Sequence, residues 1–148
     1  MSLDREVELI RGVPIFASIE PAMQKLLCFT SERVSYAPGE VMFRAGDPTD
    51  AAFIVIEGTV EITVAAAGGA QVVNKLGRND VIGEIGVMAD LPRTATATAA
   101  TRVEVLRIAK ELFCNVVRES PAAALQLAHL LARRLANTTG KLTRSASG

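Results

Sequence analysis

Short runs of β-branched and aromatic residues, separated by turn-forming glycines and prolines, occupy the middle of this 148-residue chain. The clearest runs are Val41 to Phe43, Phe53 to Ile56 and Val60 to Val64. Such side chains favour strands, and the turn residues between them keep each strand short. Regularly spaced short strands predict an antiparallel β-barrel or jelly roll over residues 34–108.

Alanine and threonine alternate from Thr94 to Thr101, which at first sight resembles low-complexity sequence. Successive side chains of a strand point to opposite faces, so a strand here would present threonines on one face and alanines on the other. We therefore expect one more strand in this stretch.

The N-terminal part, residues 1–33, is predicted to be helical. Residues 3–11 and 19–29 are the expected helices. Ser18 can cap the second of them, with Pro21 in its first turn, because serine oxygens accept from free amides at helix starts.

The C-terminal part is expected to hold a helical pair within residues 110–139. Its helices are predicted at about Lys110–Arg118 and Pro121–Thr138, and Ser120 can cap the second. Residues 140–148 carry no packing signal, so we expect a frayed tail.

Size and composition fit one globular domain over residues 1–148. With 49% hydrophobic and 22% charged residues, the chain can form a packed core and is not expected to be disordered. The predicted class is α+β, mainly β: an antiparallel barrel flanked by N-terminal helices and a C-terminal helical pair.

The sequence favours a cytoplasmic protein. No apolar run approaches the roughly 18 residues that cross a membrane, and the N-terminus is charged where a signal peptide would be apolar. Cys28 and Cys114 lie in apolar contexts, which favours buried free thiols over a disulfide.

One stretch, residues 82–96, concentrates the chemistry of the chain. Gly83 and Gly86 allow a backbone to approach a ligand closely, and amides at a short helix start can hold an oxyanion. Arg93 offers a planar fork of donors that matches phosphate oxygens, and Glu84 can accept from a sugar hydroxyl. A single arginine suits a singly charged phosphodiester better than a triphosphate, whose usual G-x-x-x-x-G-K-[ST] loop is absent.

Each of these residues also has a plainer explanation. Gly83 and Gly86 are compatible with ordinary turns, and Pro92 with the end of a short helix. Glu84 and Arg93 are compatible with a surface ion pair, which typically contributes about 0–1 kcal/mol. Their order and spacing, taken together, favour a binding site.

The stretch resembles the phosphate-binding cassette of cyclic-nucleotide-binding domains, the family of the catabolite activator protein, cyclic-nucleotide-dependent kinases and cyclic-nucleotide-gated channels. The matching residues are Gly83, Glu84, Ile85, Gly86, Val87, Pro92, Arg93, Thr94, Ala95 and Thr96. Ile82 departs from the pattern, since the family usually has phenylalanine there. The runs from Tyr36 to Asp47 and from Phe53 to Val60 are also similar to the family, and the likeness spans roughly residues 10–137. We call residues 82–96 the cassette.

The resemblance implies roles for individual residues. Arg93 would neutralise the cyclic phosphate, helped by backbone amides around Ile85–Gly86 and Ala95, and Glu84 would accept from the ribose 2′-hydroxyl. The full set of implied ligand-binding residues is Ile82, Gly83, Glu84, Ile85, Gly86, Arg93, Thr94 and Ala95.

The identity of the base is less constrained. In the family, a hydroxyl at the position of Thr94 can contact the phosphate and can also accept from the 2-amino group of a guanine. The resemblance favours cyclic AMP and allows cyclic GMP. The last helix would supply base contacts, with Arg133 and Arg134 as candidates.

Three other function classes fit the sequence less well than a sensor that binds a cyclic nucleotide. A cupin-like metalloenzyme needs several histidine and carboxylate ligands, whereas the one histidine, His129, lies outside the barrel pattern. No serine or cysteine motif has a histidine beside it in the strand region, so an enzyme is not expected, nor a metal or cofactor. A ligand-free dimerisation scaffold would not need both Glu84 and Arg93.

The length leaves no room for a helix-turn-helix domain after the last helix. The chain is therefore compatible with a stand-alone sensor and with the sensor part of a transcription regulator or channel.

Charge is zero overall but uneven along the chain. Residues 1–66 hold ten acidic and five basic residues, and residues 67–148 hold six acidic and eleven basic ones, which favours an anion in the C-terminal half. Four scattered basic residues of the last helix are not the basic stripe that duplex binding requires. They are Arg133, Arg134, Lys141 and Arg144.

The helix over 121–138 has an apolar arc wider than one docking face. We expect a homodimer through this helix, and neither nucleic acid nor membrane as a partner.

Overall fold

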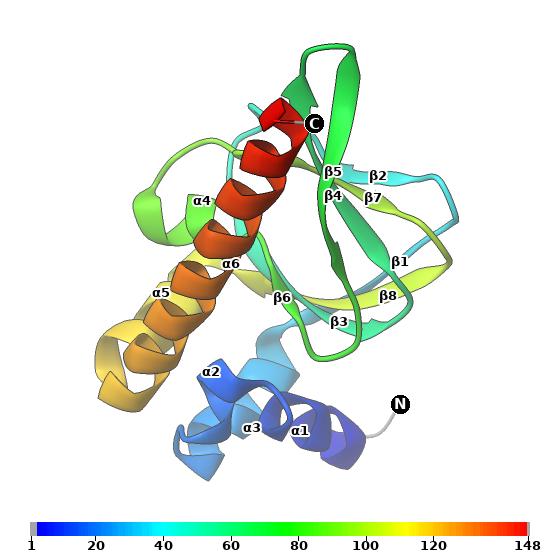
Figure 1. Cartoon of the computed structure of the whole chain (residues 1–148). Coiled ribbons are helices and arrows are strands. Elements are labelled where there is room, and N and C mark those ends of the chain that lie inside the picture. The colour runs from blue at the N-terminus through cyan, green and yellow to red at the C-terminus, as the bar shows by residue number, and fades with distance from the viewer. Residues whose placement is uncertain (1–2, 148) are drawn as a thin grey trace.

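The computed structural model describes residues 3–147, and the side chains of residues 5–137. Three helices lead into the strands: α1 (Leu3–Arg11), α2 (Pro14–Ala17) and α3 (Pro21–Thr30). They lie together at one end of the barrel, at the bottom of Figure 1.

The first helix has its predicted bounds, but the second prediction is wrong in detail. A separate short helix, α2, precedes α3, and Ser18 ends α2 instead of capping α3. The cap position of α3 is Glu20, which makes no side-chain cap, and Pro21 occupies the first turn. The fixed φ of proline suits a helix start without a capping side chain.

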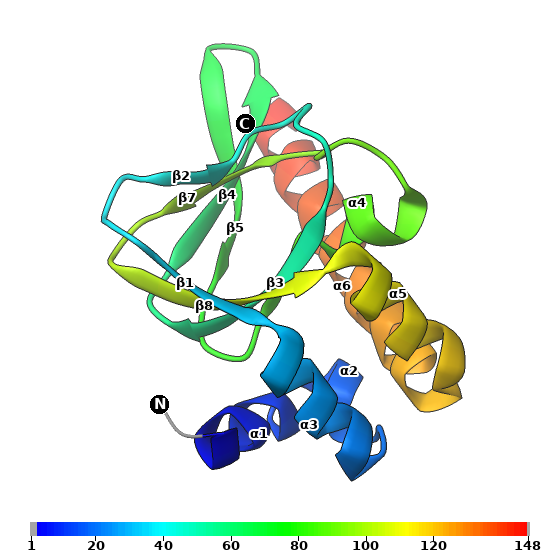
Figure 2. The same cartoon turned by 180° about the vertical axis from the view of Figure 1, so that it is seen from behind.

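The described residues form eight strands in two four-stranded antiparallel sheets. The strands are β1 (Glu32–Tyr36), β2 (Val41–Phe43), β3 (Ala51–Glu57), β4 (Val60–Ala66), β5 (Gly69–Leu76), β6 (Val81–Ile82), β7 (Thr96–Ala99) and β8 (Val103–Ala109). One sheet has the order β1-β8-β3-β6 and the other β2-β7-β4-β5. Seen from both sides, the sheets curve around a common interior (Figures 1 and 2), which confirms the predicted barrel.

Strand β3 separates two cores, and its uninterrupted run of apolar residues follows from this position. Phe53 and Val55 belong to a cluster between the two sheets. Ile54 and Ile56 belong to a second cluster, under the helices, where Phe16 of α2 also packs. A strand that is buried on both faces requires apolar side chains at every position.

The alternation around residue 97 forms strand β7, as predicted. Ala97 and Ala99 are fully buried in the barrel interior, whereas Thr96 and Thr98 are half-buried on the other face. The small side chains of these alanines allow the opposite sheet to pack close to β7.

The remaining helices are α4 (Glu84–Ala89), α5 (Lys110–Glu119) and α6 (Pro121–Ser147). The Ser120 cap is confirmed, since its Oγ accepts from the amide of Ala123 at 3.2 Å. The predicted end at Thr138 and the predicted frayed tail are wrong, because α6 continues to Ser147. One glycine inside a helix costs only about 1 kcal/mol relative to alanine, so Gly140 does not end it. Gly148 lies outside the described residues.

Both cysteines are free thiols, as predicted; Cys28 is buried and Cys114 only partly so. Burial, with a smaller contribution from Glu6, raises the pKa of Cys28 to about 11. Among the described residues, no helix is long and apolar enough to span a membrane.

Candidate functional site

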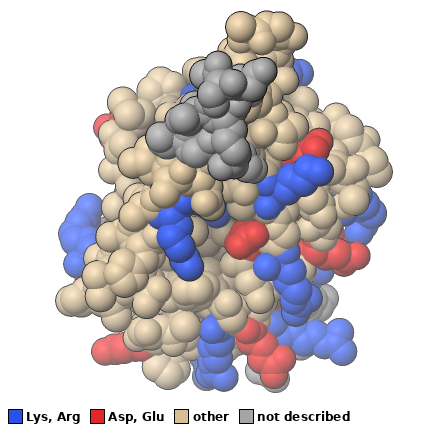
Figure 3. Space-filling model, viewed as in Figure 1, with Lys and Arg blue, Asp and Glu red and all other residues tan. Residues whose placement is uncertain are grey.

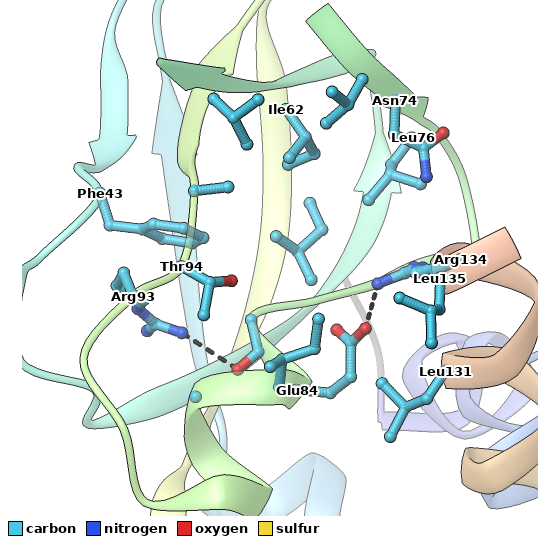
Figure 4. A pocket seen from close by; sticks show the side chains of 17 residues that line it. Phe43, Ile62, Asn74, Leu76, Glu84, Arg93, Thr94, Leu131, Arg134 and Leu135 are labelled. Atoms are coloured by element: carbon cyan, nitrogen blue, oxygen red, sulfur yellow. Dashed lines mark hydrogen bonds and ion pairs between the residues drawn. The ribbon is translucent and has the colours of Figure 1, made fainter. Parts of the chain in front are cut away.

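A cavity of about 460 Å³ lies between strands β4 and β5, the cassette and helix α6 (Figure 4). All eight ligand-binding residues that the sequence predicted line it. One end is polar, with Glu84, Arg93 and Thr94. Most of the rest is an apolar wall, made of Phe43, Ile62, Val64, Val73, Leu76, Leu131 and Leu135. Asn74 and Arg134 are further polar residues of the lining.

Arg93 is only 5% exposed, although it carries a full charge. Its Nη1 donates to the carbonyl of Gly83 at 3.1 Å, and its Nη2 donates to the carbonyl of Ala51 at 2.7 Å. Its Nε is buried and has no hydrogen-bond partner among the described residues. Burial lowers the pKa of Arg93, and the nearby carboxylate of Asp50 opposes that shift. A guanidinium remains protonated at neutral pH despite such a shift, so the site is cationic.

Two aromatic rings beside Arg93 were not predicted as site residues. The Cζ atom of Arg93 lies 4.2 Å from the ring centroid of Phe43 and 5.7 Å from that of Phe53. These rings are stacked, with centroids 6.0 Å apart. Aromatic faces attract cations, so the pair helps to hold a buried guanidinium. Phe43 and Phe53 are visible in the sequence as aromatic residues of predicted strands. The sequence does not show that their rings lie on the face of the sheet that contacts Arg93.

The loop between β2 and β3 is hydrogen-bonded to the cassette. The amide of Arg93 donates to the carbonyl of Asp47, and the amide of Gly46 donates to the carbonyl of Arg93, both at 2.8 Å. Thr49 Oγ1 donates to the carbonyl of Leu91 at 2.7 Å. Asp50 approaches Arg93 Nη2 at 3.9 Å, but this carboxylate is largely exposed and contributes little.

Glu84 begins α4 and is only 1% exposed. Its Oε1 accepts from Arg134 Nη1 of α6, which also donates through Nη2 to the carbonyl of Val81 (Figure 4). Burial raises the pKa of Glu84, and the Arg134 guanidinium works against that shift. The second carboxylate oxygen, Oε2, is buried without a hydrogen-bond partner among the described residues.

The two arginines that were candidates for base contacts differ in position. Arg134 lines the cavity and is paired with Glu84. Arg133 is exposed and is not among the lining residues. The structure therefore brings only one of them to the site.

Two cassette glycines have a different physical role from the expected one. Gly83 has φ +84°, and a Cβ there would clash with Arg93 Nη1. A Cβ at Gly86 would clash with Thr49 Oγ1. We expected these glycines to admit a ligand, but their missing side chains make room for protein groups that hold the cassette in place.

His129, the candidate considered for metal chemistry, is exposed on α6. Within the described part of the chain, no group of three or more histidine, cysteine, aspartate or glutamate side chains is placed to hold a metal ion.

The barrel, the cassette and the following helix together define a known class of sensor domain. The model of the cyclic nucleotide-binding domain family matches residues 33–120, so the chain belongs to this family.

Individual relatives point the same way. The chain is 29% identical over 136 residues to a CRP-like cAMP-activated global transcriptional regulator of Mycobacterium tuberculosis, covering 91% of this chain and 61% of that one. It is 30% identical over 119 residues to a lysophospholipase of Aspergillus fumigatus, covering 80% of this chain but 8% of the enzyme. The catabolite activator protein of Thermus thermophilus has a similar structure, with a TM-score of 0.75 and 29% identity over 90% of this chain and 63% of that one. The chain thus spans less than two thirds of these proteins.

The role of Gly83 can be tested against a matched glycine. Gly39 has φ +85° and no atom within 4 Å of a built Cβ, so Gly39→Ala adds only backbone strain, about 1–2 kcal/mol. Gly83→Ala adds the same strain and also displaces Arg93, which we expect to cost about 1–3 kcal/mol more. Urea unfolding measures both; equal losses for the two variants would contradict the Arg93 contact.

Proposed function

We propose that this chain is a regulatory sensor domain that binds a cyclic mononucleotide. One observation carries the proposal: Arg93 and Glu84 line one cavity, and each keeps a buried polar atom without a partner among the described residues. The unpaired atom of Arg93 is Nε, a donor on a cation, and that of Glu84 is Oε2, an acceptor on a carboxylate. Leaving such groups unpaired is costly. A cyclic nucleotide supplies both complements, a phosphate acceptor and a ribose hydroxyl donor.

Arg93 would bind the cyclic phosphate. A guanidinium has five N–H donors, and the two hydrogen bonds to Gly83 and Ala51 leave others free. Because these bonds and the Phe43 ring already fix the group, little conformational entropy is lost when an anion binds. Backbone amides around Ile85–Gly86 and Ala95 would complete the phosphate site.

Oε2 of Glu84 would accept a hydrogen bond from the ribose 2′-hydroxyl. The ion pair to Arg134 orients the carboxylate and counters the rise in its pKa, which favours the ionised form as the acceptor. We therefore assign Arg134 to positioning Glu84, not to the base contact that the sequence suggested.

Cyclic AMP is the favoured ligand, with cyclic GMP possible. The Mycobacterium tuberculosis relative, which is cAMP-activated, supports cyclic AMP. Thr94 has an exposed side chain that lines the cavity beside Arg93, where its hydroxyl allows cyclic GMP without requiring it (Figure 4).

A regulatory function fits better than catalysis, and the lysophospholipase relative shares with this chain only 8% of its length. A ligand-free scaffold would not need buried, partly unpaired charges. The chain also fits the sensor part of a larger transcription regulator or channel.

We propose a cytoplasmic location.

We do not propose duplex binding by these residues. On the face that Figure 3 shows, Lys and Arg side chains are interspersed with Asp and Glu. Alternating charge of this kind is not the clustered basic surface typical of DNA-binding domains.

A second copy of the chain is the proposed partner of α6. Leu125 and Leu135 are 57% and 68% exposed, and Ala128 and Ala132 between them are also exposed. Spacings of three, four and three put these residues on one face of the helix, and this face would form the seam of the proposed two-helix coiled coil.

Arg93→Ala should lower the affinity for cyclic AMP by two to three orders of magnitude, because it leaves a buried anion unpaired at a cost of about 3–5 kcal/mol. Calorimetry on the wild type and the variant measures this. Arg107→Ala is the control, since this cation also pairs with Asp50 but does not line the cavity. Unchanged affinity in Arg93→Ala would remove the phosphate assignment.

Selectivity tests the role of Thr94. We expect cyclic GMP to bind within about tenfold of cyclic AMP, a difference of about 1.4 kcal/mol. Linear AMP should bind much more weakly, because its extra charge and open ring misfit a site with one arginine. Thr94→Ala should weaken cyclic GMP more than cyclic AMP in the same titrations. Equal losses would mean that the hydroxyl serves only the phosphate.

Leu125→Glu should convert a dimer into a monomer, because it buries a charge in the proposed seam without touching the cavity. Light scattering at several concentrations measures the mass. Leu26→Glu, a similarly exposed position on α3, is the control and should leave the mass unchanged. A wild type that is strictly monomeric with and without cyclic AMP would rule out the partner.

A further inference from the structure

Asn74 is a polar residue on a strand whose other residues that line the cavity, Val73 and Leu76, are apolar. It lies on β5, opposite Ile62 of β4, and lines the cavity beside Val73 and Leu76. In Figure 4 its amide lies on the side of the cavity nearest Arg134 and Leu135, away from the phosphate end at Arg93. An amide in an apolar wall needs a hydrogen-bond partner, or its desolvation is a cost.

A β-bulge accounts for the position of Asn74. Ile62 pairs with Asn74 and the next residue, Thr63, pairs with Val72, so Val73 has no partner in the ladder. In a regular strand two successive residues point to opposite faces, yet both Val73 and Asn74 line this cavity. Bulges redirect side chains in this way and are common beside binding sites.

The orientation of the Asn74 amide is also fixed. Its Oδ1 accepts from the amide of Lys75 at 2.9 Å, so Nδ2 is the free end. Among residues with described side chains, Nδ2 donates to no other group. The wall therefore presents a donor of two N–H groups that no neighbouring acceptor uses.

We infer that Asn74 recognises the base, with Nδ2 donating to a ring nitrogen of a purine. This inference rests on the proposed function, and it adds a base contact on the barrel wall to the contacts that the cassette would make. A donor complements the lone-pair ring nitrogens of adenine and cannot pair with its exocyclic amino group. The flanking leucine and valine side chains suit the apolar faces of the ring.

A cycle of protein and ligand variants tests the inference. Wild type and Asn74→Leu are titrated with cyclic AMP and with its 1-deaza, 3-deaza and 7-deaza analogues, each of which replaces one ring nitrogen by C–H. We expect one analogue to bind the wild type about five- to tenfold more weakly than cyclic AMP, as for the loss of one hydrogen bond. In Asn74→Leu this difference should fall below twofold.

Asn74→Asp keeps the side-chain volume and should reverse the preference between cyclic AMP and the deaza analogue. One carboxylate oxygen can still accept from Lys75, while the other replaces the donor, so the same deaza analogue should bind at least as well as cyclic AMP. Asn115→Leu, on the exposed face of α5, is the control and should retain the wild-type pattern. Wild-type affinities that are equal for cyclic AMP and all three analogues would overturn the inference, as would an undiminished difference in Asn74→Leu. Either result leaves the proposed function standing if Arg93→Ala still lowers the affinity for cyclic AMP by two to three orders of magnitude, whereas absence of cyclic AMP binding by the wild type would remove both.

Discussion

The buried guanidinium of Arg93 is the interaction on which the site depends. It holds three separate segments together: the carbonyl of Gly83 in the cassette, the carbonyl of Ala51 in β3, and the ring of Phe43 in β2. A charge removed from water must be surrounded by acceptors, so these groups cannot move apart without a large cost. The cassette therefore keeps its shape through the same residue that gives it its positive charge.

The pair between Glu84 and Arg134 connects this site to the last helix. Oε1 of the carboxylate accepts from α6, and Oε2 is the proposed acceptor for a ribose hydroxyl. A ligand and the helix would thus share one side chain. Binding that favours the ionised, oriented carboxylate also favours the helix position that supplies Arg134, because equilibria linked through a common group shift together.

The sequence predicted what is encoded locally. The cassette lies within fifteen contiguous residues, and it lines one cavity as predicted. The strands β2, β3 and β4, the Ser120 cap and the alternation of β7 each follow from short patterns and were predicted. The missed features depend on tertiary placement. The contact of Phe43 with Arg93 depends on sheet register, and the pairing of Arg134 with Glu84 depends on the rotation of α6. The position of Asn74 in the cavity lining depends on a bulge that breaks strand alternation. The Ser18 cap failed because an extra helix ends there.

The cassette and the apolar wall of the cavity differ in how freely their residues can be substituted. Arg93 and Gly83 cannot change independently, because the space left by one is filled by the other, and both support the fold as well as any ligand. The apolar wall is under a weaker constraint, since hydrophobic residues of similar volume replace one another at modest cost. Asn74 occupies that wall, uses one end of its amide on Lys75, and leaves the other end to the cavity. A substitution at Asn74 would therefore change the proposed base contact while the phosphate site and the barrel stay intact, because Asn74 makes no hydrogen bond to either Arg93 or Gly83.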